Sequence, residues 1–132
     1  RSYSHHKEEK VSENPWHDLG GPGYRLENLG RPAVFFVPVR NFHREVRDEL
    51  ERTLGEKFGA FSADDVPNRG VWRGSDGRLV EDRSLKYEVS FVGKERIPEL
   101  ASILATLARR IGEECIYLKA GQYTCTVHPT EK

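Results

Sequence analysis

The sequence predicts a single α+β domain in which an antiparallel sheet carries two helices on one face. Residues 70–91 read as a β-hairpin, because residues 75–77 (Ser-Asp-Gly) supply turn chemistry and an alternating strand follows. The apolar face of that strand is Leu85, Tyr87, Val89 and Phe91. An amphipathic helical pattern flanks the hairpin on each side, over residues 42–58 and 97–111. The length of 132 residues fits one domain with one core.

Two segments precede the first predicted strand. Residues 1–14 are polar and charged, without a period that would bury a face, so we expect a disordered arm. Residues 15–32 are rich in glycine and proline yet carry Trp16 and Tyr24, which a free linker seldom does. We therefore expect an irregular lead-in packed on the domain. The domain proper is expected over residues 33–128, with a tail over residues 129–132.

The first strand and first helix are predicted over residues 33–58. Residues 33–39 are apolar on both faces, which is typical of a central strand covered on both sides, and Pro38 should lie near its end. Asn41 is expected to cap the helix and Gly59 to end it. The apolar stripe of the helix recurs at every fourth position, at Phe42, Val46, Leu50, Leu54 and Phe58.

A loop over residues 60–69 leads into the hairpin, and a second helix follows it. Pro98 suits the first turn of that helix and Gly112 its end, around a stripe that consists of Ile97, Leu100, Leu104, Leu107 and Ile111. Residues 115–118 are a strand, and residues 122–127 form either a C-terminal hairpin with it or part of a bent strand. This order is that of the ferredoxin-like βαββαβ fold, with room for an extra C-terminal strand.

Composition argues against several classes of partner. The 21 basic and 21 acidic residues give no net charge, so no basic field attracts nucleic acid, and the outward residues of the third strand, Lys86, Glu88 and Ser90, offer no base-stacking platform. Phe35 or Phe36 remains as a residue on which a base would stack. No apolar run of membrane-spanning length or apolar leader occurs, and two cysteines are too few for a disulfide framework. We expect a cytoplasmic protein that binds neither membrane nor nucleic acid.

The face of the sheet without helices needs a cover, because the first strand is apolar on that side too. Contiguous exposed apolar surface is rare on monomers. The cover is either the lead-in segment or a second copy of the chain, so we expect a homodimer or a protein partner.

A small-ligand site is predicted at the near end of the hairpin. Trp72 offers a stacking face, and Arg73 and Glu81 would provide polar groups if they lay close to Lys119 and Gln122. The alternative for Trp72 is a structural role in packing. The catalytic residues stay unknown, since no nucleophile motif or phosphate-binding loop occurs. Asp64, Asp65, Glu81 and Asp82 would provide a general base if a pocket gathered them, and are otherwise solvated carboxylates.

No cofactor or metal is expected. Cys115, Cys125 and His128 are the best metal candidates, yet their spacing matches no compact zinc module. The two cysteines are either free thiols or a disulfide across a terminal hairpin, if they lie opposite one another.

The run GVWRGSDGRLVE, residues 70–81, precedes an alternating strand, a helix and a final β segment. Over about residues 42–118 this pattern resembles small uncharacterised bacterial and phage domains that have a G-x-W turn and a G-x-L-x-E step. The resemblance implies the same fold and carries no activity with it.

Together these features favour a non-enzymatic binding or accessory protein that acts through its sheet face or its hairpin. The alternative is a small enzyme or metabolite sensor whose pocket lies between the hairpin and the C-terminal strands.

Overall fold

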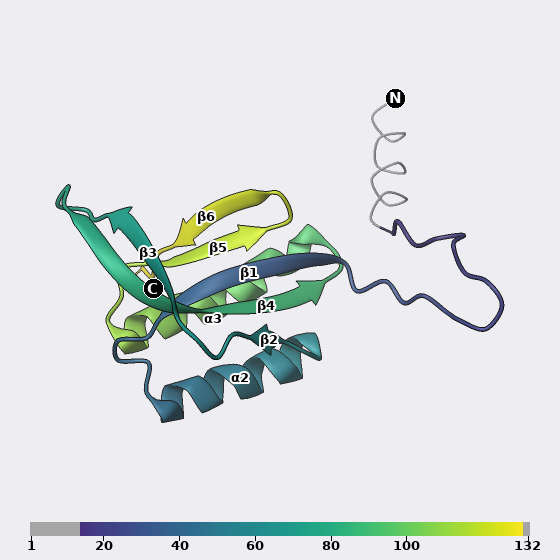
Figure 1. Ribbon diagram of the computed structural model, residues 1–132, viewed down its shortest axis with the longest axis horizontal. Helices are drawn as coiled ribbons and strands as arrows, with labels where there is room; N and C mark the ends of the chain where they lie inside the picture. The colour runs from purple at the N-terminus through teal and green to yellow at the C-terminus, as the bar shows by residue number, and fades with distance from the viewer. Residues whose placement is uncertain (1–13, 131–132) are drawn as a thin grey trace.

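In the computed structural model, described over residues 14–130, one six-stranded antiparallel sheet carries both helices on one face (Figure 1). The elements in chain order are β1 (Arg31–Pro38), α2 (Arg44–Phe58), β2 (Ser62–Ala63), β3 (Asn68–Arg73), β4 (Leu79–Phe91), η1 (Lys94–Arg96), α3 (Ile97–Ile111), β5 (Ile116–Ala120) and β6 (Tyr123–Val127). The sheet order is β2-β4-β1-β5-β6, and β3 also pairs with β4. The α+β, ferredoxin-like prediction is confirmed, and the C-terminal run is a hairpin.

The core lies between the sheet and the two helices. Side chains alternate between faces along a strand, so every second residue of β1, β4 and β5 points toward the helices. Phe35, Tyr87 and Leu118 lie on that face and are buried, and Leu54 and Leu100 meet them from α2 and α3. The predicted core face of β4 is therefore confirmed.

Both helices end where the sequence indicates, but the start of α2 differs from the prediction. Gly59 adopts a left-handed conformation (φ 84°) after α2, and Gly112 does the same (φ 72°) after α3, as glycine allows at a helix end. The predicted cap Asn41 was wrong: His43 occupies the N-cap position, while Asn41 has a positive φ of 65°. Its side-chain amide instead donates to the carbonyl of Ile111, and so ties this loop to the end of α3.

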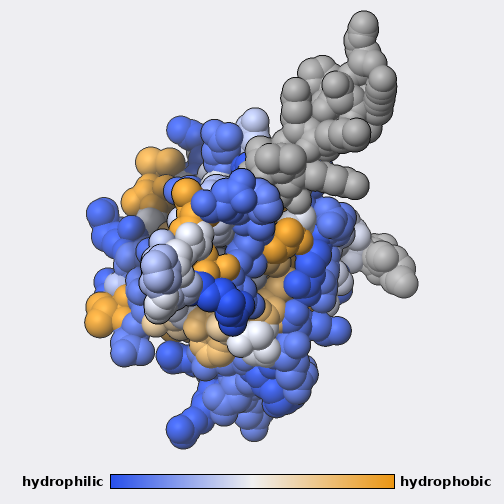
Figure 2. Space-filling view, turned by 90° about the vertical axis from the view of Figure 1, so that its right-hand side faces the viewer, coloured by the Kyte–Doolittle hydropathy of each residue, from blue (hydrophilic) through white to orange (hydrophobic). Residues whose placement is uncertain are grey.

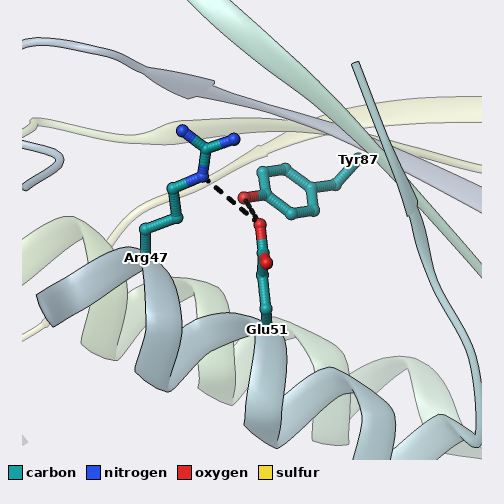
Figure 3. A network of polar contacts seen from close by, with 3 residues as sticks. All are labelled: Arg47, Glu51 and Tyr87. Carbon is teal, nitrogen blue, oxygen red and sulfur yellow. Dashed lines mark hydrogen bonds and ion pairs between the residues drawn. The ribbon is translucent and has the colours of Figure 1, made fainter. Parts of the chain in front are cut away.

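A partly buried polar link joins α2 to the sheet (Figure 3). The Tyr87 hydroxyl donates a hydrogen bond of 2.6 Å to Glu51 Oε2, and Arg47 Nε reaches the same oxygen at 3.4 Å. The Tyr87 ring stacks on Phe35 with centroids 5.4 Å apart. Burial, followed by the Glu51 hydrogen bond, raises the pKa of Tyr87 above its ordinary value. This hydroxyl therefore stays protonated and serves as a donor.

The lead-in runs away from the sheet instead of across it (Figure 1). Its large apolar side chains, Trp16, Leu19, Tyr24, Leu26 and Leu29, are between 42% and 61% exposed. Gly30 (φ 85°) turns the chain at the start of β1, where a Cβ would collide with the Phe91 carbonyl. The packing predicted for residues 15–32 is thus not seen in the single chain. Of the predicted arm, residues 1–14, all but Asn14 lie outside the described residues, as do residues 131–132 of the tail.

Candidate functional site

A pocket lies on the helix-free face of the sheet, under the β3–β4 hairpin. Only the second half of β4 pairs with β1, so its first half forms a two-stranded ribbon with β3. Two-stranded ribbons twist more strongly than wide sheets. The hairpin thereby joins β1, β5 and β6 in enclosing a cavity of about 320 Å³, which we call the hairpin pocket.

Three aromatic side chains form the apolar wall of the hairpin pocket. Phe36 and Tyr117 are direct partners across β1 and β5, and their rings lie 5.6 Å apart at 49°. Trp72 comes from β3 on the hairpin. Gly70 also lines the pocket, and a Cβ built on it meets no atom within 4 Å. A larger residue at Gly70 would therefore fill the pocket without displacing its surroundings.

Asp82 is the charged side chain of the hairpin pocket. It lies directly opposite Gly70 in the β3–β4 ladder, and its Oδ2 accepts a hydrogen bond of 2.7 Å from Trp72 Nε1. This bond fixes the position of the indole nitrogen beside Asp82. No other charged residue lines the pocket among residues 14–130. The pocket therefore combines aromatic walls with one negative charge.

Burial and carboxylates shape the acid–base properties beside the pocket. Burial raises the pKa of Glu113, the negative charge of Asp82 adds to this rise, and Arg40 opposes it. Burial also raises the pKa of the Cys115 thiol, together with the charge of Glu114, while a hydrogen bond with Thr126 opposes the rise. The Cys115 thiol, which lines the pocket, therefore stays protonated near neutral pH.

The residues predicted as a ligand site do not converge. Trp72 lines the hairpin pocket, but Arg73 and Glu81 lie on the opposite face of the hairpin, because neighbouring residues of a strand point to opposite sides. Arg73 donates to the Gly77 carbonyl at 2.7 Å, and Glu81 forms an ion pair of 2.7 Å with Arg69. Lys119 stands on β5 opposite Val34. Gln122 lies in the β5–β6 turn.

Gln122 belongs to a second cavity at the other end of the sheet. That cavity has a volume of about 370 Å³ and includes Arg31, Lys94 and Tyr123 in its lining. Figure 2 looks at this end of the molecule, where hydrophobic surface shows between hydrophilic residues. Trp72 and Gln122 therefore belong to two different cavities.

Several residues of the hairpin pocket were not part of the predicted ligand site: Phe36, Asp82, Ser84, Cys115, Tyr117 and Thr126. Phe36 was considered only for base stacking, and Cys115 only as a metal ligand or in a disulfide. The alternation of side chains along a strand could have indicated two of these pocket residues. Phe36 and Tyr117 are aromatic residues on the outward side of central strands, where polar residues are typical. That signal does not reveal that the hairpin bends over them, which depends on tertiary structure.

The cysteines are free, and the alternative of a disulfide between them is wrong. Cys125 lies opposite Leu118 in the β5–β6 ladder, on the helix side of the sheet, whereas Cys115 lines the hairpin pocket on the other side. Among residues 14–130, no group of three or more His, Cys, Asp or Glu side chains is placed to hold a metal ion. None of the helices in this part of the chain has the length and apolar character needed to cross a membrane.

Comparison with known proteins finds no matching family model and no matching curated protein. Among solved structures, a phage SAM lyase in complex with S-methyl-5′-thioadenosine aligns with a TM-score of 0.59 at 17% identity, covering 85% of this chain and 99% of the lyase. A divalent cation tolerance protein from Thermus thermophilus aligns with a TM-score of 0.48 at 16% identity, covering 77% of this chain and 84% of that one. At this identity, the likeness to the phage lyase shows a shared α+β fold.

Proposed function

We propose that this protein binds a small, flat aromatic molecule of nucleoside size in the hairpin pocket. The observation that carries the proposal is the pocket itself, with Phe36, Trp72 and Tyr117 as walls and Asp82 as its charge. Ligand pockets are mostly apolar, hold a few polar groups and measure about 300–1,000 Å³. The volume of about 320 Å³ lies at the lower end of this range and suits a ligand of two or three rings.

The proposed contacts follow from the chemistry of the wall. An aromatic ring of the ligand stacks on Trp72 or Tyr117, and the Asp82 carboxylate accepts a hydrogen bond from an amino or hydroxyl group. Because the pocket has one negative charge and aromatic faces attract cations, a positive charge on the ligand strengthens binding. Asp82 already holds the Trp72 indole, so the recognition surface is formed before the ligand arrives.

Adenine nucleosides are the first probes to test. The phage SAM lyase with the similar fold holds S-methyl-5′-thioadenosine, a neutral purine nucleoside. S-adenosylmethionine contains the same nucleoside with a positive sulfonium group. Binding of both compounds would show recognition of the shared ring, and tighter binding of S-adenosylmethionine would show recognition of its sulfonium together with its amino-acid chain.

The test is calorimetric titration of the full chain with both nucleosides, alongside Gly70→Val, which fills the pocket, and Gly55→Ala, which lies in α2 away from it. The proposal predicts saturable binding to the wild type and to Gly55→Ala, and none to Gly70→Val. Bound ligand should also slow modification of Cys115 by a thiol reagent in a Cys125→Ser background. If neither nucleoside binds, or if Gly70→Val binds as well as the wild type, the proposed ligand class is wrong.

We favour binding without catalysis. Of the side chains that line the pocket, Asp82 is the carboxylate that could act as a base, and Cys115 is the thiol that could act as a nucleophile. Asp82 is engaged by Trp72, and the raised pKa of Cys115 keeps the thiol protonated, whereas a reactive cysteine needs a lowered pKa. Recovery of unchanged nucleoside after incubation supports this view. Conversion of the nucleoside would identify the protein as a small enzyme instead.

A second candidate function is docking of a protein partner, or a second copy, through the lead-in. The exposed apolar side chains from Trp16 to Leu29 favour it, since a monomer seldom leaves such residues uncovered. Replacing both Trp16 and Leu29 by serine should leave the thermal midpoint unchanged and weaken association in sedimentation. Unchanged association would exclude the lead-in as the docking segment.

The two free cysteines support placing the protein in the reducing cytoplasm.

A further inference from the structure

The strand β6 is an unprotected edge of the sheet. Its inner side pairs with β5 from Tyr123 to Val127, and no other described strand pairs with its outer side. Four of its five residues are exposed. The sequence Tyr-Thr-Cys-Thr-Val contains no charge and no proline, and its residues favour strands. Such an edge presents unpaired backbone groups to any strand that fits.

The opposite edge of the sheet is protected. There β2 is only two residues long, and Asp64, Asp65 and Pro67 stand within the four residues that follow it. The neighbouring strand β3 carries Arg69 and Arg73, which are exposed. Short strands, charges and proline are the usual means of blocking edge pairing. The contrast marks β6 as the edge that is available for association.

We propose that β6 pairs antiparallel with β6 of a second copy, centred on Cys125, to form one continuous sheet across a two-fold axis. This register is the one that pairs all five residues of both strands. It sets Tyr123 opposite Val127 of the second copy, Thr124 opposite Thr126, and Cys125 opposite itself. Aromatic with β-branched residues and threonine with threonine are favourable cross-strand pairs. The strand is therefore complementary to itself, which an isologous interface requires.

The surroundings of β6 leave room for this pairing. After β6 the chain turns toward α3, where Arg109 Nη1 donates to the Thr130 carbonyl at 2.9 Å. A two-fold axis perpendicular to the sheet keeps the helices of both copies on one face and both hairpin pockets on the other. The association therefore extends the sheet without using the walls formed by Phe36, Trp72 and Tyr117, and it does not depend on the proposed ligand.

Disulfide formation through Cys125 can test the register of the proposed β6–β6 pairing. Residues that oppose one another across antiparallel strands have Cα atoms about 4.5–5.5 Å apart, which lies within the range that a disulfide spans. In a Cys115→Ser background, mild oxidation with diamide should therefore convert the chain to a covalent dimer. Moving the cysteine by one residue, in Cys115→Ser with Cys125→Ser and Thr124→Cys, should give much less dimer, because residue 124 then faces residue 126. Equal crosslinking of both variants would overturn the register.

A pair of substitutions tests the association without crosslinking. Cys125→Lys sets two like charges directly opposite one another, whereas Cys125→Ser keeps a small neutral residue. Sedimentation should show a dimer for the wild type and for Cys125→Ser, and a dissociation constant raised roughly tenfold or more for Cys125→Lys, a loss of about 1.4 kcal/mol. A monomeric wild type, or a dimer that survives Cys125→Lys unchanged, refutes the proposal. Circular dichroism checks that Cys125→Lys is folded, and the diamide experiment decides the question if it is not.

Discussion

Replacing Tyr87 with phenylalanine should destabilise the protein by removing one hydroxyl from the link between α2 and the sheet. The side chain is 0% exposed, and its hydroxyl donates to Glu51 Oε2 at 2.6 Å. Phenylalanine keeps the ring that stacks on Phe35, so packing of the core is preserved. The change therefore isolates one hydrogen bond to a carboxylate.

The expected loss follows from the burial of the acceptor. A hydrogen bond to a charged group contributes about 1.5–3 kcal/mol. The Glu51 side chain is 28% exposed and keeps Arg47 as a partner, so water and the guanidinium offset part of the loss. We expect the free energy of unfolding to fall by about 1–2 kcal/mol, compared with about 3–5 kcal/mol for a change of a buried ring to alanine.

Urea unfolding followed by circular dichroism measures this loss, and Tyr117→Phe is the control. Tyr117 lies on the open face and is partly exposed, so its hydroxyl should contribute less than about 0.5 kcal/mol. In a double-mutant cycle, Tyr87→Phe should cost much less once Glu51 is alanine. A loss below about 0.5 kcal/mol for Tyr87→Phe, or no coupling to Glu51, would refute the role assigned to this link.

The pH dependence of the same variant has a definite sign. The folded state raises the pKa of Tyr87 above its ordinary value of 10.0, mainly through burial. Above that pH the unfolded chain loses the proton while the folded chain keeps it, so the stability of the wild type falls as pH rises. Tyr87→Phe has no hydroxyl to titrate and so lacks this contribution to the pH dependence of stability. The difference in unfolding free energy between the two proteins should therefore shrink in alkaline urea titrations, and a constant difference would contradict the assigned cause.

Three further changes test other parts of the structure. Gly30→Ala should lower the free energy of unfolding by about 2 kcal/mol or more in urea titrations, because Gly30 has φ 85° and a Cβ would meet the Phe91 carbonyl. Gly55→Ala within α2 should raise the free energy of unfolding by about 0.5–1 kcal/mol, because glycine is less favourable than alanine inside a helix. Burial raises the pKa of Glu113, so this carboxyl contributes stability that is lost as pH rises from the acid range through its pKa. Over that range, thermal melts of Glu113→Gln should therefore lose less stability than those of the wild type. Trp72→Phe removes the donor to Asp82 and should lower the unfolding free energy by about 1 kcal/mol while the chain stays folded.

Each of these changes has an outcome that would count against its physical reason. Equal effects of Gly30→Ala and Gly55→Ala would mean that the turn at Gly30 tolerates a side chain. If Glu113→Gln keeps the pH dependence of the wild type, another group controls it. Global unfolding of Trp72→Phe would make Trp72 a core residue, which was the alternative structural role for it.

Local patterns predicted the elements well because their causes are local. The stripe of α2 with Leu50 and Leu54 buried, and the left-handed glycine at Gly59, depend on helix geometry and on the missing side chain of glycine. The alternation of β4 likewise assigned Tyr87 to the core. Asn41 failed as a cap because its amide meets Ile111, a residue 70 positions away that no local pattern can place beside it.

The sequence by itself determined the order of the main strands and helices and the face of each that is buried, since hydrophobic periodicity encodes both. It did not reveal β2, the two-residue strand Ser62–Ala63, because residues 60–69 have the composition of a loop. Only the tertiary structure decided how these elements meet. It separated Trp72 from Arg73, Glu81, Lys119 and Gln122, and brought it over Phe36 and Tyr117 instead. The reason is physical. The β3–β4 hairpin extends beyond the end of β1, and its twist places Trp72 above the neighbouring strands. Twist and relative strand length depend on how several strands pair, so a pattern within one segment cannot predict them.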